Sequence, residues 1–284
     1  MPRGSVSPPA VALFRNRKQT TKQKGVCAIP PNPEGIGFPR AILMIPWKDY
    51  FDKIYCVHYL PHKDRLPRLL KELDRVGITE SGILEWRYTV PDTYDEIIWK
   101  VAEKNKWCSR KAYVNLSLEN HRLLKQAMLL GLKRILVLED DIAFLRRLED
   151  IEPILKSIPV EYGIVQFDKR ANFPQGEESV WKDLVAKSKI NPFFVKSTRN
   201  FANATAMGYF NEGIEDAYKV LDTRTCTPDR IVKFTNKPHA IAIKSLAIQH
   251  LYDSAINLTF DKADTIHYAC YQQVGVKCDE YLDG

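Results

Sequence analysis

Three consecutive acidic residues follow directly on a short apolar segment near the middle of the chain. Residues 135–138 are aliphatic, Glu139, Asp140 and Asp141 come next, and apolar residues resume at Ile142. The apolar run is typical of a strand that a parallel sheet buries on both faces. Mutual repulsion and lost hydration both disfavour three carboxylates at the end of such a strand. The triplet is therefore a candidate for chemistry.

The acidic triplet has two interpretations. In the first, its carboxylates are solvated or cap the next segment, although the apolar residues on both sides disfavour full exposure. In the second, they bind a divalent cation, because carboxylate oxygens are ligands that Mg²⁺ and Mn²⁺ prefer. Alternation along an extended segment places Glu139 and Asp141 on one face and Asp140 on the other. One aligned carboxylate would bind metal while the other accepts hydrogen bonds from a ribose or sugar. Similar acidic pairs occur in phosphatases and nucleases.

A second polar cluster ends the first predicted strand, residues 53–60. It runs from His58 to Arg65 and offers cations that suit phosphate oxygens. In the alternative interpretation, Asp64 caps the following helix and the nearby arginines are only solvated. The sequence lacks G-x-G-x-x-G, Walker A and G-x-S-x-G motifs, which weakens hydride-transfer, P-loop and serine-hydrolase interpretations.

The elements that must position these clusters alternate between strands and helices. Strands are predicted at 53–60, 84–90, 134–139, 162–167, 205–210 and 239–243, helices at 66–76, 115–130, 147–157, 212–221 and from Pro228, and an irregular polar excursion at 170–191. This alternation predicts an α/β fold with a mainly parallel sheet covered by helices on both faces. Such sheets bind ligands at the carboxyl ends of their strands, so both polar clusters are expected in one crevice.

Length, charge and composition limit the class of protein that this chain can be. The chain has 284 residues and a formal net charge of +7. Residues 1–45 are rich in Pro, Gly, Lys and Arg and are predicted to be a flexible leader, with a single catalytic domain at 46–284. The basic leader would suit an anionic partner or simply aid solubility. No apolar run reaches the roughly 18 residues of a membrane span, and no signal peptide is evident, so a cytoplasmic location is predicted.

Four blocks of the sequence resemble, in the same order, the family 25 glycosyltransferases, which include lipooligosaccharide and procollagen-type sugar transferases. The blocks lie within residues 53–257 and read IYCVHYLPHKDRLPRLLKELDRVGI, LENHRLLKQAMLLGLKRILVLEDDI, ATAMGYFNEGIEDAYKVL, and PDRIV followed by HAIAIKSLAIQHLYDSAI. The resemblance implies a GT-A-type fold for binding nucleotide-diphospho-sugars, with Mn²⁺ or Mg²⁺ as cofactor. The chain departs from the family at Glu119-Asn120-His121, where Ser usually precedes His, and at His62-Lys63, where arginines are usual. Both departures leave the donor sugar open.

The resemblance also implies roles for individual residues. Glu139 and Asp141 stand where the family has the Asp-x-Asp pair that binds Mn²⁺ and the nucleotide sugar. Asp141 and His250 are the predicted metal ligands, although packing or capping is the alternative for His250. Asp229 is the candidate general base, which would deprotonate an acceptor hydroxyl while the metal stabilises the departing diphosphate. The predicted donor-binding residues are His58, Asp64, Arg65, Glu139 and Asp140.

The function predicted from the sequence is that of a metal-dependent hexosyltransferase. It would move a sugar from a UDP-sugar to a hydroxyl acceptor, expected to be a cell-surface glycan of the lipooligosaccharide type. The basic leader could then hold the enzyme at an anionic membrane surface. A hydroxylated base in DNA or a hydroxylated protein side chain is the alternative acceptor. Two alternatives of another class are a non-catalytic nucleotide-sugar-binding module and a metal-dependent phosphoesterase.

Overall fold

The computed structural model describes most of the chain between Ile45 and Gln249. The described ranges are 45–89, 111–144, 146, 148–168, 177–201, 204–223, 228–235 and 237–249. Residues 1–44 and the predicted metal ligand His250 lie outside the described residues. The division into a leader at 1–45 and a catalytic domain at 46–284 therefore stays a prediction.

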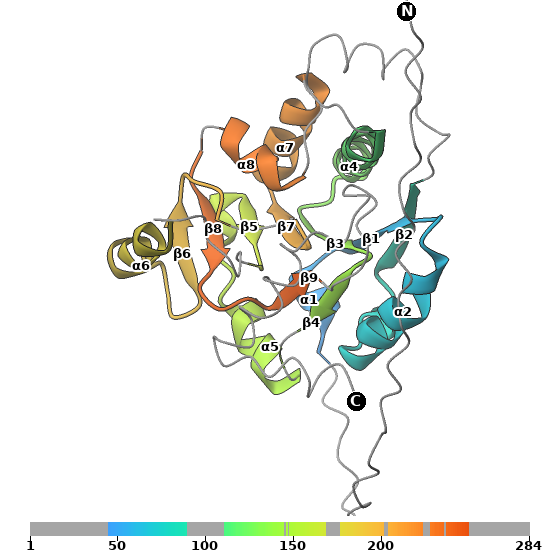
Figure 1. The fold of residues 1–284 in the computed structure, drawn as a ribbon, viewed down its shortest axis with the longest axis horizontal. Helices are drawn as coiled ribbons and strands as arrows, with labels where there is room; N and C mark the ends of the chain where they lie inside the picture. Colours follow the sequence, from blue (N-terminus) through green and yellow to red (C-terminus); the bar gives the residue numbers. More distant parts are fainter. Residues whose placement is uncertain are drawn as a thin grey trace, which may run out of the picture. The chain divides into compact units, whose positions relative to one another are not determined.

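A seven-stranded sheet forms the centre of the described part (Figure 1). Its order is β2-β1-β3-β7-β5-β8-β6, with bounds β1 Lys53–Tyr59, β2 Leu84–Thr89, β3 Arg134–Glu139, β5 Ile164–Gln166, β6 Phe194–Ser197, β7 Ala206–Phe210 and β8 His239–Ala242. β7 runs antiparallel to β3 and β5, and β6 runs antiparallel to β8, while the other neighbours are parallel. Five of the seven strands therefore share one direction, and the predicted α/β class with a mainly parallel sheet is confirmed. A small antiparallel pair joins β4, Ile142–Phe144, to β9, Ala247–Gln249.

Helices cover both faces of the sheet, as predicted (Figure 1). α4, α7 and α8 lie on one face, and α2 and α5 lie on the other. The helix bounds are α1 Trp47–Tyr50, α2 Leu66–Arg75, α4 Lys111–Leu129, α5 Leu148–Lys156, α6 Glu177–Lys187, α7 Glu212–Thr223 and α8 Pro228–Phe234, with 3₁₀ turns η1 Lys63–Arg65, η2 Thr79–Ser81 and η3 Val160–Tyr162. No helix within these described ranges combines the length and apolar character needed to cross a membrane.

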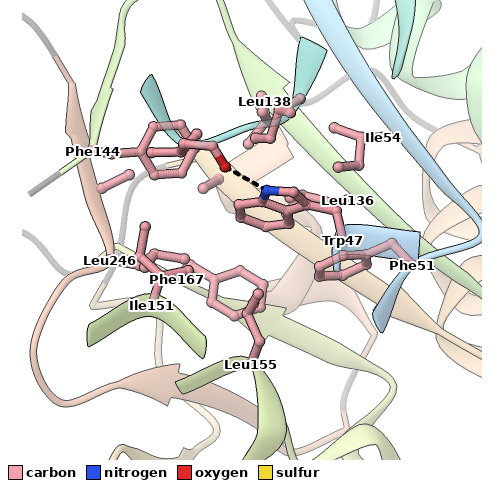
Figure 2. Close-up of a cluster of buried hydrophobic side chains, with 14 of the residues drawn as sticks. Trp47, Phe51, Ile54, Leu136, Leu138, Phe144, Ile151, Leu155, Phe167 and Leu246 are labelled. Carbon is pink, nitrogen blue, oxygen red and sulfur yellow. Dashed lines mark hydrogen bonds between the residues drawn. The ribbon is translucent and has the colours of Figure 1, made fainter. Parts of the chain in front are cut away.

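Alternate residues of the central strands enter two separate cores, one on each face. In β1, Ile54 and Cys56 belong to the core under α2 and α5, whereas Tyr55 and Val57 belong to the core under α4 and α7. This period of two explains why the strand reads as a continuous apolar run. Figure 2 shows the first core, where the buried Trp47 indole nitrogen donates a hydrogen bond of 2.7 Å to the carbonyl of Val76.

The prediction of irregular structure across residues 170–191 is wrong, because α6 occupies Glu177–Lys187. The helix is mostly polar, and exposed ion pairs at i, i+4 spacing join Glu178 to Lys182 and Asp183 to Lys187. Its one buried residue is Trp181, which packs edge-on against Phe201 with ring centroids 5.6 Å apart. Trp181, Leu184 and Val185 stand at the i, i+3 and i+4 spacing of a helix and pack into one small core, so the apolar signal of α6 is present in the sequence but short.

A buried histidine makes the stability of the fold dependent on pH. His239 begins β8 opposite Ser197 and is 1% exposed. Burial lowers the pKa of His239 to about 4. The folded state therefore keeps His239 neutral at a pH where the unfolded chain, with a pKa near 6.5, already binds a proton. Stability contributed by neutral His239 is complete above about pH 6.5 and is lost as the pH falls toward 4.

We expect protonation of His239 to lower the free energy of unfolding by about 3 kcal/mol between pH 7 and pH 4. Urea unfolding at a series of pH values, in wild type and in His239→Phe, measures the contribution as the difference between the two curves. The variant should lose stability less steeply below pH 6.5. Parallel curves for the two proteins would contradict the prediction.

Candidate active site

Polar residues from several segments meet at the carboxyl ends of three strands. His58 lies near the end of β1, Glu139 ends β3, and Asp168 follows β5 by two residues. Asp229 lies in the first turn of α8. The site therefore occupies the edge at which open α/β sheets bind their ligands.

Asp140 is the centre of a buried hydrogen-bonded cluster that joins β1 to the turn after β3. Its Oδ2 accepts hydrogen bonds from His58 Nδ1 and from the backbone N–H of Tyr59, each at 2.9 Å. Its Oδ1 accepts a hydrogen bond from Arg65 Nη1 at 2.7 Å. His58, Arg65 and Asp140 are 1%, 3% and 7% exposed, respectively. The predicted meeting of the first-strand cluster with the acidic triplet is thus confirmed.

The Asp140 cluster stabilises a negative charge away from water. Burial by itself would raise the pKa of Asp140, but the hydrogen bond from His58 and the charge of Arg65 outweigh it and hold the pKa below its usual value. Arg65 Nη1 also lies 3.7 Å from Asp141 Oδ2, so this guanidinium faces two members of the triplet. Asp64, in the same 3₁₀ turn, is exposed to solvent.

The other two acids of the triplet face a group of carboxylates from distant segments. The pKa of Glu139 is raised well above its usual value. Burial has the largest effect, and the negative charges of Asp141, Asp229 and Asp168 add to it. Asp141 is 7% exposed and Asp168 is fully buried. Four carboxylates from β3, the turn after it, the segment after β5 and α8 therefore share one region of negative potential. Such a region attracts cations.

Two amide side chains connect this carboxylate group to the sheet. Asn200 Nδ2 donates a hydrogen bond of 3.2 Å to Asp229 Oδ2. Gln166 Nε2, at the end of β5, donates one of 3.3 Å to Asn200 Oδ1. Gln166 is fully buried and Asn200 is 8% exposed. Asp229, itself half-buried, is thus held from a strand of the central sheet.

The carboxylate oxygens of this site suit a hard divalent cation that binds together with a substrate. Among the described residues, no group of three or more His, Cys, Asp or Glu side chains is arranged to hold a metal ion by itself. Mg²⁺ usually binds through one or two carboxylates and completes its shell with water and substrate phosphates. The oxygen atoms of Glu139 and Asp141 suit such a shared site, and the raised pKa of Glu139 marks a negative field that a cation would relieve.

Three residues of the site were not identified from the sequence. Asp168 follows the predicted strand at 162–167 just as the triplet follows β3, so the same strand-end rule would have found it. Gln166 and Asn200 carry no comparable signal. They become part of the site because the chain between β6 and β7 brings Asn200 between β5 and α8.

No family model matches the chain, and no curated protein matches it in sequence. Among solved structures, a glycosyltransferase involved in the glycosylation of the major capsid of PBCV-1 is 12% identical, with 64% of this chain and 74% of that chain covered and a TM-score of 0.35. The inositol-1-phosphate CTP transferase from T. maritima is 11% identical, with 78% and 96% covered and a TM-score of 0.38. A cytidylyltransferase from Leptospira borgpetersenii is 12% identical, with 79% and 96% covered and a TM-score of 0.35. Scores of this size identify neither a family nor an activity, so the α/β assignment rests on the strand order and register.

Proposed function

We propose that this chain is a transferase that moves a sugar from a UDP-sugar to a hydroxyl group, with Mn²⁺ or Mg²⁺ bound at the acidic cluster. The observation that carries the proposal is the group of four carboxylates formed by Glu139, Asp141, Asp168 and Asp229, beside the buried Asp140 cluster that anchors the turn after β1. An acidic region of this kind beside a cationic turn suits a metal-bound diphosphate. The resemblance of four ordered sequence blocks to family 25 glycosyltransferases supports the same chemistry.

On the donor side, Asp141 and Glu139 would bind the cation, with His250 as a further candidate ligand. The cation would supply charge stabilisation for the departing diphosphate. Arg65 has two functions in this proposal: its hydrogen bond to Asp140 positions the turn, and its positive charge lies close to Asp141. His58 supports the same carboxylate from β1. Asp64 is exposed in the same turn, where it would contact the donor directly.

On the acceptor side, Asp229 would act as the general base. The acceptor oxygen forms a bond to the anomeric carbon of the sugar, and the bond from that carbon to the diphosphate oxygen breaks. The electron pair of the broken bond leaves with UDP, and the proton of the acceptor hydroxyl passes to the Asp229 carboxylate. A cell-surface glycan is the proposed acceptor, with the basic leader contacting an anionic membrane surface. DNA and protein hydroxyls are the alternatives to compare in an acceptor screen.

Titration calorimetry with a panel of UDP-hexoses, with and without Mn²⁺, tests the donor site. We expect binding that requires Mn²⁺ in wild type. In Asp141→Asn the affinity should fall by at least the roughly 10–100-fold that the loss of an outer-shell partner of a metal costs. Asp183→Asn, an exposed aspartate in α6, is the matched control and should bind as wild type does.

Four outcomes would overturn this assignment in different ways. Absence of UDP-sugar binding by wild type removes the donor on which the transferase depends. Release of pyrophosphate from CTP would identify a nucleotidyltransferase, and release of phosphate from a simple ester would identify a phosphoesterase. Binding of the nucleotide sugar without Mn²⁺ and without turnover would identify a binding module.

A further inference from the structure

We infer that Asn200 is a positioning residue that sets the orientation of the Asp229 carboxylate, and that Gln166 in turn sets the orientation of Asn200. The inference rests on the proposed function, in which Asp229 accepts the proton of the acceptor hydroxyl. It concerns the two hydrogen bonds that lead from β5 through Asn200 to α8.

The chemistry of the three side chains permits one direction for this chain of hydrogen bonds. An ionised carboxylate only accepts hydrogen bonds, so the Asn200 amide must present its Nδ2 to Asp229 Oδ2, 3.2 Å away. The Asn200 amide oxygen then faces Gln166 and must be met by a donor. Gln166 supplies that donor through Nε2, at 3.3 Å. Each amide thereby fixes the orientation of the next group.

Gln166, the first residue in this series of hydrogen bonds, is held rigidly. Gln166 is fully buried at the end of β5 and pairs with Met207 of β7 and Ile241 of β8. Next to Asn200 along the chain, Phe201 is buried against Trp181 of α6. The central sheet and α6 therefore help to set the position of Asn200.

The hydrogen bond to Oδ2 gives the Asp229 carboxylate a fixed partner on the side of the sheet. The charge of this carboxylate acts on Glu139 together with those of Asp141 and Asp168, and like charges favour rotation of the carboxylate away from the group. A donor on Oδ2 restricts that rotation and holds the carboxylate in one orientation. Asn200 achieves this without adding a charge that would compete with the cation.

Asn200→Asp is the informative variant, because it keeps the size of the side chain and can still accept from Gln166 but cannot donate to Asp229. Turnover is followed as UDP release from the donor identified by calorimetry. We expect kcat to fall about 100-fold, as for a misplaced catalytic group, while Mn²⁺-dependent donor binding is retained because an added carboxylate does not repel the cation. Asn191→Asp is the matched control, since Asn191 donates to Ser157 O at 2.8 Å in a loop outside the site, and its kcat should match that of wild type.

The double variant Asn200→Asp/Asp229→Asn separates positioning from simple structural support. The exchange restores one amide and one carboxylate, so the hydrogen bond re-forms with donor and acceptor reversed. We expect the melting temperature to recover toward that of wild type while kcat stays low, because the carboxylate has moved off α8. Recovery of both quantities would overturn the inference, as would an unchanged kcat in Asn200→Asp. Failure of wild type to bind any UDP-sugar would instead refute the proposed function.

Discussion

Asp140→Ala is expected to reduce the free energy of unfolding by about 3–5 kcal/mol, as is typical when one partner of a buried ion pair is removed. The substitution leaves the guanidinium of Arg65, which is 3% exposed, without the carboxylate at 2.7 Å that now accepts its hydrogen bond. It also removes the acceptor for His58 and for the backbone N–H of Tyr59. Urea unfolding at pH 7 measures the loss.

Asp216→Ala is the matched control for this stability prediction. Asp216 also forms an ion pair, with Lys237 at 2.6 Å, but the two side chains are 23% and 55% exposed. Exposed pairs contribute roughly 0–1 kcal/mol, so this variant should unfold close to wild type. If both variants lost a similar free energy of unfolding, burial would not be the reason why the Asp140 cluster stabilises the fold.

Glu139→Gln is expected to change stability and activity in opposite directions. Burial and the facing carboxylates raise the pKa of Glu139, so a charge on this side chain costs free energy in the folded state. A neutral side chain of the same shape removes that repulsion, and we expect a gain of about 0.5–2 kcal/mol in the free energy of unfolding, typical of substitutions that trade function for stability. Turnover should fall about 10²–10³-fold, as when a single electrostatic contact to the reacting group is lost.

The measurements are thermal unfolding with and without Mn²⁺, and UDP release. Mn²⁺ should raise the melting temperature of wild type because it binds the folded state, and should raise that of Glu139→Gln much less. Glu161→Gln, at an exposed position in η3, should behave as wild type in each assay. A less stable Glu139→Gln protein would contradict the view that the acidic cluster is a source of repulsion.

Much of the fold could be predicted from the sequence because buried strands and helices leave a regular spacing of apolar residues. β1 and β3 are apolar throughout because both of their faces are buried. α2 and α4 have apolar residues at helical spacing because one face of each helix is buried. The sequence did not predict α6 or β6. Nor did it predict that β7 is antiparallel, since strand direction depends on which neighbour the chain returns to.

The sequence by itself determined that an acidic triplet ends a buried strand and that a cationic turn shares its edge of the sheet. The first follows from the continuous apolar run of β3, and the second from the common edge of parallel strands. Only the tertiary structure decided that Asp140 is held by His58 and Arg65 while Glu139 faces Asp168 and Asp229. Only it brought Asn200 between β5 and α8. The physical reason is that electrostatic and hydrogen-bonded neighbours are set by distance in space, which strand order and chain crossings determine and local sequence does not record.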